Sequence, residues 1–392
     1  MNKERVNKLL NKLPTHVIII LTMLIWIVPT LGLLITSLRP PAEVGTTGWW
    51  TVFTPKNASG PYATYCADCH GADGKALPQA DLTNPELIAK YPRSLQLLAM
   101  LRKDINGKPH MGDHPLPSAQ EAADIASYLR QGKVASSGFT FNNYIDALVG
   151  YRGRSTYRAD CAAGTQPPDI KCNLSDILNP RGMGRAFVNS LLVTLPATFL
   201  PILFAAFAGY AFAWLDFKGR FLLFALLVGL QVVPLQMTLV PISRFYARVG
   251  LNGTFLGVWL FHTGFGMPYA IYLMRNFLGT LPRDLFESAY LDGASHWTAF
   301  RHLVIPLAMP AIASLGIFQF LWVWNDLLVA LVFLGGTTPV MTYQISNMVT
   351  SLGSGWQVLT AAAFLSMLLP MIVFFSLQRY FVRGMLAGAV KG

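Results

Sequence analysis

The chain has 392 residues, of which 53% are hydrophobic and only 12% are charged, and its formal net charge is +11. Soluble domains carry about 25% charged residues, so this composition excludes a disordered or purely soluble protein. The charge is unevenly spread, because residues 39–184 have a net charge of +2 and the remaining residues +9. That excess flanks long apolar segments, as in membrane proteins. A basic nucleic-acid-binding face is the weaker interpretation, and no nucleic-acid partner is expected.

Long uncharged stretches predict six membrane-spanning helices, since a span needs about 20 mainly apolar residues. The longest stretch, residues 327–378, contains turn residues at 335–339 and 351–355 and is therefore divided in two. The predicted spans cover residues 13–38, 186–215, 221–243, 249–274, a fifth helix that ends near Leu334, and about 358–379.

The first apolar run is either a cleaved signal peptide or an anchor. It is longer than the apolar region of 7–15 residues that is typical of signal peptides, and no A-x-A site follows it. Both features favour an uncleaved anchor. Basic residues then orient the chain, because they concentrate in segments that six spans place on one side. We expect a multi-pass membrane protein with both termini cytoplasmic and residues 39–184 on the outer side.

Residues 66–70 of this outer segment read Cys-Ala-Asp-Cys-His. The C-x-x-C-H spacing is typical of covalent c-type haem attachment, in which two thiols form thioethers and the adjacent imidazole binds iron. A C-x-x-C redox pair and half of a zinc site are the alternatives. Zinc needs further ligands, for which His110 and His114 are candidates, whereas a redox pair leaves His70 without a role.

Two downstream features favour haem. Met111 ends the run Ile-Asn-Gly-Lys-Pro-His-Met, and methionine is the sixth ligand in many electron-transfer haems. Ser118 and Glu121 form a capping box, and the helix that it begins is predicted to place four apolar residues on one face. Those residues are Ala122, Ile125, Ala126 and Leu129.

Residues of about 60–133 therefore resemble a small class I cytochrome c. Cytochromes c are assembled on the outer face of bacterial membranes, so the resemblance implies a protein of the bacterial inner membrane with residues 39–184 in the periplasm. The resemblance implies a covalent haem c, with Cys66 and Cys69 as its anchors and His70 and Met111 as iron ligands. Met111 is followed by Gly where the family usually has Pro, so His110 and His114 remain alternative distal ligands.

Cys161 and Cys172 lie in a polar loop rich in Gly and Pro. In an oxidising compartment two remaining thiols are expected to form a disulfide, which would contribute about 3 kcal/mol for a loop of this size. Free thiols are the alternative.

The loop between the predicted fourth and fifth spans, residues 281–306, has a polar–apolar helix pattern, a break at Gly293 and a second helix that leads to Pro306. It resembles the E-A-A…G…I-x-L-P loop of ABC importer permeases, with Ser288 in place of the middle Ala. In that family the loop docks on the ATPase subunit. The resemblance implies coupling roles for Glu287, Ala289, Asp292, Gly293 and Pro306.

Other segments resemble carbohydrate-import permeases of the six-span maltose-transporter type, among them residues 189–191, 208–213, 322–326 and the tail from Arg379. The resemblance implies an all-α fold, in which a six-helix ABC importer permease carries a small helical cytochrome c-like domain in its first periplasmic loop. The expected divisions are residues 1–56, a haem domain over 57–137, a connector over 138–184 and a five-helix core over 185–392.

No G-x-x-x-x-G-K-[ST] phosphate-binding loop occurs in the sequence, so we expect no nucleotide on this chain and ATP hydrolysis by a separate subunit. The family resemblance implies a second permease subunit, an ATPase dimer and a periplasmic binding protein as partners, and the haem adds a periplasmic redox partner. The substrate class that it implies is a sugar or a related polyol.

Four polar or aromatic residues of the predicted fifth span are candidates for the substrate path. Asp326 is expected about 17 residues into that helix, where an acid is costly and usually faces a cavity or a partner. A polar contact with a partner permease is the alternative. The candidates are Gln319, Trp322, Asn325 and Asp326.

Two functions compete for the chain. It is either a transport subunit, or a membrane-anchored electron-transfer protein whose spans only hold the haem. The coupling loop favours transport, because an anchor has no use for it. A third interpretation combines both, with the haem as a redox sensor or as a donor to a periplasmic enzyme.

Overall fold

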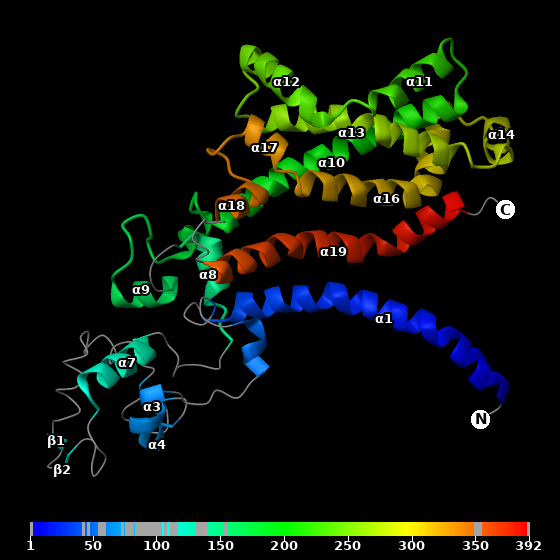
Figure 1. The fold of residues 1–392 in the computed structure, drawn as a ribbon. Helices are drawn as coiled ribbons and strands as arrows, with labels where there is room; N and C mark the ends of the chain where they lie inside the picture. The colour runs from blue at the N-terminus through cyan, green and yellow to red at the C-terminus, as the bar shows by residue number, and fades with distance from the viewer. Residues whose placement is uncertain are drawn as a thin grey trace. The chain divides into compact units, whose positions relative to one another are not determined.

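The computed structural model describes residues 3–40, 44, 48–53, 60–71, 74, 82, 104–105, 108–109, 117–130, 139–151, 156–348 and 355–389. These residues are helical apart from one short antiparallel strand pair, which confirms the all-α class (Figure 1). Contacts divide the chain into two compact units, one of residues 1–146 with 350–361 and one of residues 147–349 with 362–392.

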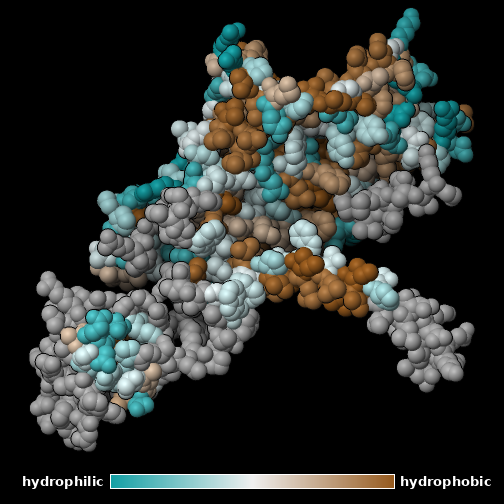
Figure 2. Space-filling view, in the orientation of Figure 1, coloured by the Kyte–Doolittle hydropathy of each residue, from teal (hydrophilic) through white to brown (hydrophobic). Residues whose placement is uncertain are grey.

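The first unit begins with α1 (Lys3–Leu38), whose portion from Pro14 to Leu38 is apolar enough to cross a membrane. Within that portion most side chains are exposed and apolar (Figure 2). The Thr22 and Thr30 hydroxyls donate to carbonyls one turn back in the same helix, so these polar groups remain satisfied in lipid.

The end of α1 is held by the segment that follows residue 138. The Asn143 side chain donates to the Ser37 and Arg39 carbonyls at 2.8 Å, and Asn143 is fully buried. These bonds satisfy carbonyls that a helix end leaves without intrahelical partners. The remaining elements of this unit are short: η1 (Trp49–Phe53), α3 (Gly60–Tyr65), α4 (Ala67–His70), β1 (Asp104–Ile105), β2 (Lys108–Pro109) and α7 (Ala119–Arg130).

The second unit begins within α8 (Asn142–Val149) and continues through α9 (Tyr157–Ala163) and η3 (Leu174–Leu178). Its core packs α10 (Met183–Trp214) against α13 (Phe255–Leu278) and α16 (Ile305–Trp324). Gly209 lets α10 and α13 approach closely, because a Cβ there would lie 2.7 Å from the Cβ of Met274. Small residues at such contacts are typical of membrane helix packing.

The predicted third span is wrong as a single helix. The structure forms α11 (Arg220–Leu230) and α12 (Leu235–Val249), which are bent relative to each other by 97°. Pro234 explains the break, since proline disfavours the helical conformation of the residue before it.

The predicted fifth span is also wrong at its end. The helix stops at Trp324, and α17 (Leu328–Phe333) starts a new helix. Asp326 therefore lies in the break rather than inside a helix. Its carboxylate accepts the backbone N–H groups of Val329 and Ala330 at 2.9 and 3.2 Å, so it acts as an N-terminal cap of α17.

Four helices of the described residues are long and apolar enough to cross a membrane, and five if α11 and α12 form one bent span. They confirm the predicted first, second and last spans; the last is α19 (Trp356–Ala389), which follows α18 (Met341–Met348). Helix α13 covers most of the predicted fourth span in 24 residues, but buried polar residues such as His262 and Thr263 lower its hydropathy. The count of six spans stays a prediction.

The Asn189-Ser190 pair links α10 to the segment before α18. The Asn189 amide donates to the Pro339 carbonyl at 2.8 Å, and the Ser190 hydroxyl accepts from the Met341 N–H at 2.9 Å. Both side chains are buried, so this pair in the permease-like motif fixes a neighbouring chain segment.

Candidate functional sites

The C-x-x-C-H segment continues the turn of α3. Backbone bonds run from the Cys66 N–H to the Tyr62 carbonyl and from the His70 N–H to the Cys66 carbonyl, both at 2.9 Å. Cys66 and Cys69 are thus about one helical turn apart, the spacing at which two side chains share a face. Both thiols are free; Cys66 is buried and Cys69 is exposed, and His70 is buried.

An apolar cluster lies beside Cys66. Tyr62 and Ile125 are almost fully buried, and the Tyr62 ring stacks on the Tyr128 ring with centroids 5.0 Å apart. Ile125 and Tyr128 come from α7, so this helix packs against the signature segment.

The predicted capping box at the start of α7 is confirmed as well. The Glu121 N–H donates to the Ser118 hydroxyl at 3.2 Å, and the Ser118 N–H donates to the Glu121 carboxylate at 2.8 Å. The Tyr65 hydroxyl also donates to this carboxylate, at 3.0 Å. The Ser118 bonds and then the Tyr65 bond lower the pKa of Glu121.

The donor set at the signature fits a covalent haem. Two unpaired thiols one turn apart, a buried imidazole directly after them and an apolar wall are the groups that such a cofactor uses. Burial, with a smaller contribution from Cys69, raises the pKa of the Cys66 thiol to about 11. Met111, His110 and His114, the candidate distal ligands, lie outside the described residues.

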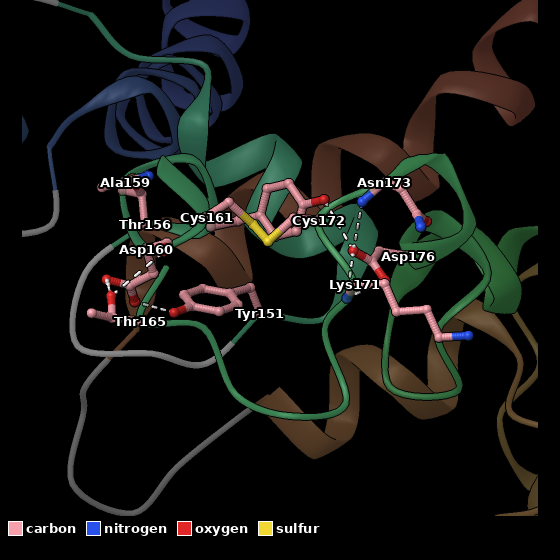
Figure 3. The surroundings of a disulfide bond; sticks show 11 residues. Tyr151, Thr156, Ala159, Asp160, Cys161, Thr165, Lys171, Cys172, Asn173 and Asp176 are labelled. Carbon is pink, nitrogen blue, oxygen red and sulfur yellow. Dashed lines mark hydrogen bonds between the residues drawn. A yellow bond between two sulfur atoms is a disulfide. The ribbon is translucent and has the colours of Figure 1, made fainter. Parts of the chain in front are cut away.

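Cys161 and Cys172 are joined by a disulfide bond in the connector, with their Cα atoms 5.6 Å apart (Figure 3). The bond ties α9 to the loop that leads into η3. Next to it, the Tyr151 hydroxyl donates to the Asp160 carboxylate, as the dashed line in Figure 3 shows. Val149, Tyr151 and Ile170 form a small buried cluster that the two cysteines contact.

Asp176 organises the rest of the connector. Its buried carboxylate accepts the Lys171 and Asn173 N–H groups, at 3.1 and 3.2 Å, and the Tyr157 hydroxyl at 3.0 Å. Burial would by itself raise the pKa of Asp176, but the hydrogen bonds outweigh it and hold the pKa below its usual value.

The loop predicted to couple to an ATPase consists of α14 (Arg283–Leu291), a break at Gly293 and α15 (His296–Ala299). Gly293 has φ +84°, a conformation that glycine adopts without the penalty of a Cβ, so the predicted break is confirmed. Glu287 and Asp292 are exposed, and Ala289 is half-buried. The loop therefore presents carboxylates to its surroundings.

The second half of the loop continues into α16 as one uninterrupted helical stretch. Residues 300–304 form a π-helical turn, in which the Ile305 N–H bonds the Phe300 carbonyl. Pro306 follows at once, and because proline lacks an N–H and crowds the preceding turn, the wider turn accommodates it. Pro306 is thus inside a continuous helical stretch from His296 to Trp324.

Sequence reasoning missed the residue that anchors α14. Phe286 is 1% exposed, and its ring stacks on that of Trp214, at the end of α10, with centroids 3.9 Å apart. The apolar pair Leu285-Phe286 in a largely polar helix was the available signal, but the partner of Phe286, 72 positions earlier, could not be predicted from spacing.

The substrate-path candidates do not share one open face. Gln319 is buried against Gly266 and donates to the Ala197 carbonyl at 3.1 Å, while the Asn325 amide donates back to the Leu321 carbonyl. Trp322 is 38% exposed. The structure thus gives Gln319 a packing role.

The space beside Asp326 is small. Ser190, Thr194 and His262 line a cavity there, which has room for about one water molecule and none for a sugar ring. His262 Nε2 lies 4.0 Å from the Asp326 carboxylate. In this conformation no sugar contacts Asp326 through the cavity.

The packed, long apolar helices define the class of protein as a multi-pass membrane protein, and comparisons identify the family. Residues 187–387 match the binding-protein-dependent transport system inner membrane component family, and residues 54–129 match cytochrome c oxidase, cbb3-type, subunit III. The chain belongs to the first family. It is the permease subunit of an ABC importer and a multi-pass membrane protein, and it carries a cytochrome c-type segment.

Two relatives are similar over nearly the whole chain. The osmoprotective compounds uptake permease protein GgtD of Synechocystis sp. is 43% identical over 100% of this chain and 96% of its own length. The alpha-glucoside transport system permease protein AglG of Rhizobium meliloti is 40% identical over 96% of each chain.

A solved bacterial ABC transporter that imports the acidic polysaccharide alginate is 21% identical to the chain, with a TM-score of 0.44. The match covers 61% of this chain and 89% of the solved one.

Proposed function

We propose that this permease imports a small α-glucoside or a related polyol. The observation that carries the proposal is the similarity, over nearly the full length, to two uptake permeases whose names specify osmoprotective compounds and alpha-glucosides. Neutral hydroxyl-rich solutes of this kind need no charged residue on the path, which agrees with the scarcity of acids in the core, where Asp326 is already engaged as a cap.

The transport cycle takes its energy from a separate ATPase dimer. Loop 281–306 docks on that dimer, with Glu287 and Asp292 as its exposed carboxylates and Phe286 as its anchor in the membrane core. A second permease subunit completes the pathway, and a periplasmic binding protein delivers the solute. The support is the family membership together with the Gly293 break.

Uptake into proteoliposomes tests the transport role. The complex, purified with its co-eluting subunits, is reconstituted with ATP on the side of the coupling loop, and radiolabelled trehalose serves as the α-glucoside. We expect ATP-dependent accumulation, and we expect Glu287→Ala to remove most of it while leaving the chain folded. Asp284→Ala, an exposed acid on the same helix, is the matched control. ATP-independent or absent uptake in the wild type would refute the proposal.

The outer segment, residues 57–137, is proposed to be an inserted domain that holds a covalent haem c on the periplasmic side of the inner membrane. Cys66 and Cys69 would form the thioethers, and His70 and Met111 would ligate the iron. The haem would supply one-electron transfer. The support is the free, suitably spaced thiol pair and the cytochrome family match over residues 54–129.

That family match also favours a second function for the same chain, the transfer of an electron to a periplasmic redox partner. The variant Cys66→Ala/Cys69→Ala tests the haem and separates the two roles. We expect it to lose the absorption of a reduced c-type haem. Retained trehalose uptake would show that haem and transport are independent, whereas retained haem absorption would contradict the assignment of the two anchors.

A further inference from the structure

Three side chains meet where the coupling loop touches α10. Tyr210 lies near the end of α10, Tyr290 near the end of α14, and His296 is the first residue of α15. The two hydroxyl oxygens are 2.9 Å apart, and His296 Nδ1 lies 3.1 Å from the Tyr290 hydroxyl and 3.3 Å from that of Tyr210. The loop thus forms polar contacts with a membrane helix on both sides of its break.

Tyr210, Tyr290 and His296 form a triangle of polar groups that can hydrogen-bond to one another without a further partner. Each hydroxyl both donates and accepts, and Nδ1 of histidine either accepts or donates according to its proton. With Nδ1 unprotonated, one hydroxyl donates to the other and the second donates to the imidazole. With Nδ1 protonated, the same chain of bonds runs in reverse. The contact therefore persists in either state of His296.

Aromatic packing covers the Tyr210 side of the triangle. The Phe300 ring lies 4.7 Å from the Phe207 ring and 5.5 Å from the Tyr210 ring, centroid to centroid. Tyr210 is only 6% exposed. This packing partly shields the hydrogen bonds of the Tyr210 hydroxyl from water and strengthens them, whereas the bond between Tyr290 and His296 is exposed.

Gly293 lies between Tyr290 and His296, and a Cβ placed on it would meet no atom within 4 Å. At the break itself only backbone bonds hold the turn: the Gly293 and Ala294 N–H groups donate to the Tyr290 and Ala289 carbonyls, both at 3.0 Å. The Phe286–Trp214 stack fixes α14, and the triangle ties α14, α15 and α10 together.

We propose that Tyr210, Tyr290 and His296 form a clasp that passes movement of the coupling loop to α10. They are positioning residues, and the inference rests on the proposed ATP-driven import. Without the clasp, the loop bends at Gly293 when the ATPase pulls on it, and ATP is hydrolysed without transport.

The test measures trehalose transported per ATP hydrolysed in the reconstituted complex. For Tyr290→Phe and Tyr210→Phe we expect a fall of about fivefold, the factor that corresponds to one hydrogen bond of about 1 kcal/mol, with ATP hydrolysis retained. Because the residues act as a unit, the double variant should fall by less than the product of the two single effects. Tyr269→Phe on α13 is the matched control, since the Tyr269 hydroxyl makes no hydrogen bond within the described part of the chain.

Two substitutions of His296 distinguish a hydrogen-bonding role of this residue from a purely structural one. His296→Asn keeps a polar atom at the position of Nδ1 and should preserve the ratio, while His296→Ala should lower it. Ratios equal to that of Tyr269→Phe in all clasp variants would overturn the proposal, as would uptake and hydrolysis that fall in parallel. A wild-type complex without ATP-driven uptake would instead overturn the transport function on which the clasp rests.

Discussion

Replacing Gly209 by alanine should weaken the contact between α10 and α13. The added Cβ would lie 2.7 Å from the Met274 Cβ and 3.1 Å from the Arg275 backbone N. Part of the obstruction is backbone, so no side-chain rotation relieves it and the helices must move apart. Overpacking of this kind costs about 1–3 kcal/mol, which exceeds the gain of up to about 1 kcal/mol that alanine brings to a helix.

Thermal unfolding of the detergent-purified chain, followed by tryptophan fluorescence, measures this effect. Gly264→Ala on α13 is the matched control, because Gly264 is exposed and a Cβ there meets nothing within 4 Å. We expect a lowered midpoint for Gly209→Ala and an unchanged or slightly raised one for Gly264→Ala. Equal midpoints for the two variants would refute the inference that Gly209 sets the distance between the helices.

Three further changes test the connector and the broken fifth span. The folded-state pKa of Asp176 is lower than its ordinary value of 3.8, so its carboxylate stabilises the connector above that value and the benefit is lost as the pH falls through the lower folded pKa. Asp176→Asn should lower the free energy of unfolding by about 1–3 kcal/mol at neutral pH and make it depend less on acid pH. An unchanged pH dependence of unfolding below neutral pH would contradict this. Asp326→Ala should lower the free energy of unfolding by about 1 kcal/mol and speed the hydrogen exchange of backbone amides in α17. Asp326→Asn keeps an oxygen that can cap the helix and should not change the exchange. Equal exchange rates in the two variants would argue against the cap. Breaking the disulfide with Cys161→Ser should cost about 3 kcal/mol and expose the connector to trypsin, and undiminished resistance would speak against its role.

Signals that act within a few residues were read correctly from the sequence. Ser118 and Glu121 form the expected capping box, because both partners lie in one helical turn. The break at Gly293 was predicted because glycine, without a Cβ, is the residue that takes a positive φ most easily. The apolar runs of α1, α10 and α19 likewise predicted their own helices.

The errors arose where hydropathy hid local breaks. Residues 221–243 are uncharged throughout, and their apolar character concealed the stop that Pro234 imposes. In the fifth span Asp326 was treated as an acid inside a helix, although aspartate is also a preferred N-terminal cap. The cap interpretation required a helix end, and Asn325-Asp326 was its only sign within an otherwise apolar stretch.

Contacts between distant residues could not be predicted at all. Phe286 meets Trp214, and Tyr290 meets Tyr210, through packing of α14 on α10. Periodicity reports which face of a helix is apolar, but it does not report which residue of another helix that face will touch. The clasp is therefore visible only in the structure.

The central claim is that one chain joins a periplasmic haem to an ATP-driven permease. A reduced-minus-oxidised spectrum of the chain purified from bacterial membranes, taken on the chromatographic peak that contains its co-eluting subunits, tests this most directly. We expect a c-type haem spectrum, with one haem per chain, in the same peak as an ATPase subunit. A haem-free chain, or a haem-bearing chain that never elutes with an ATPase, would contradict it.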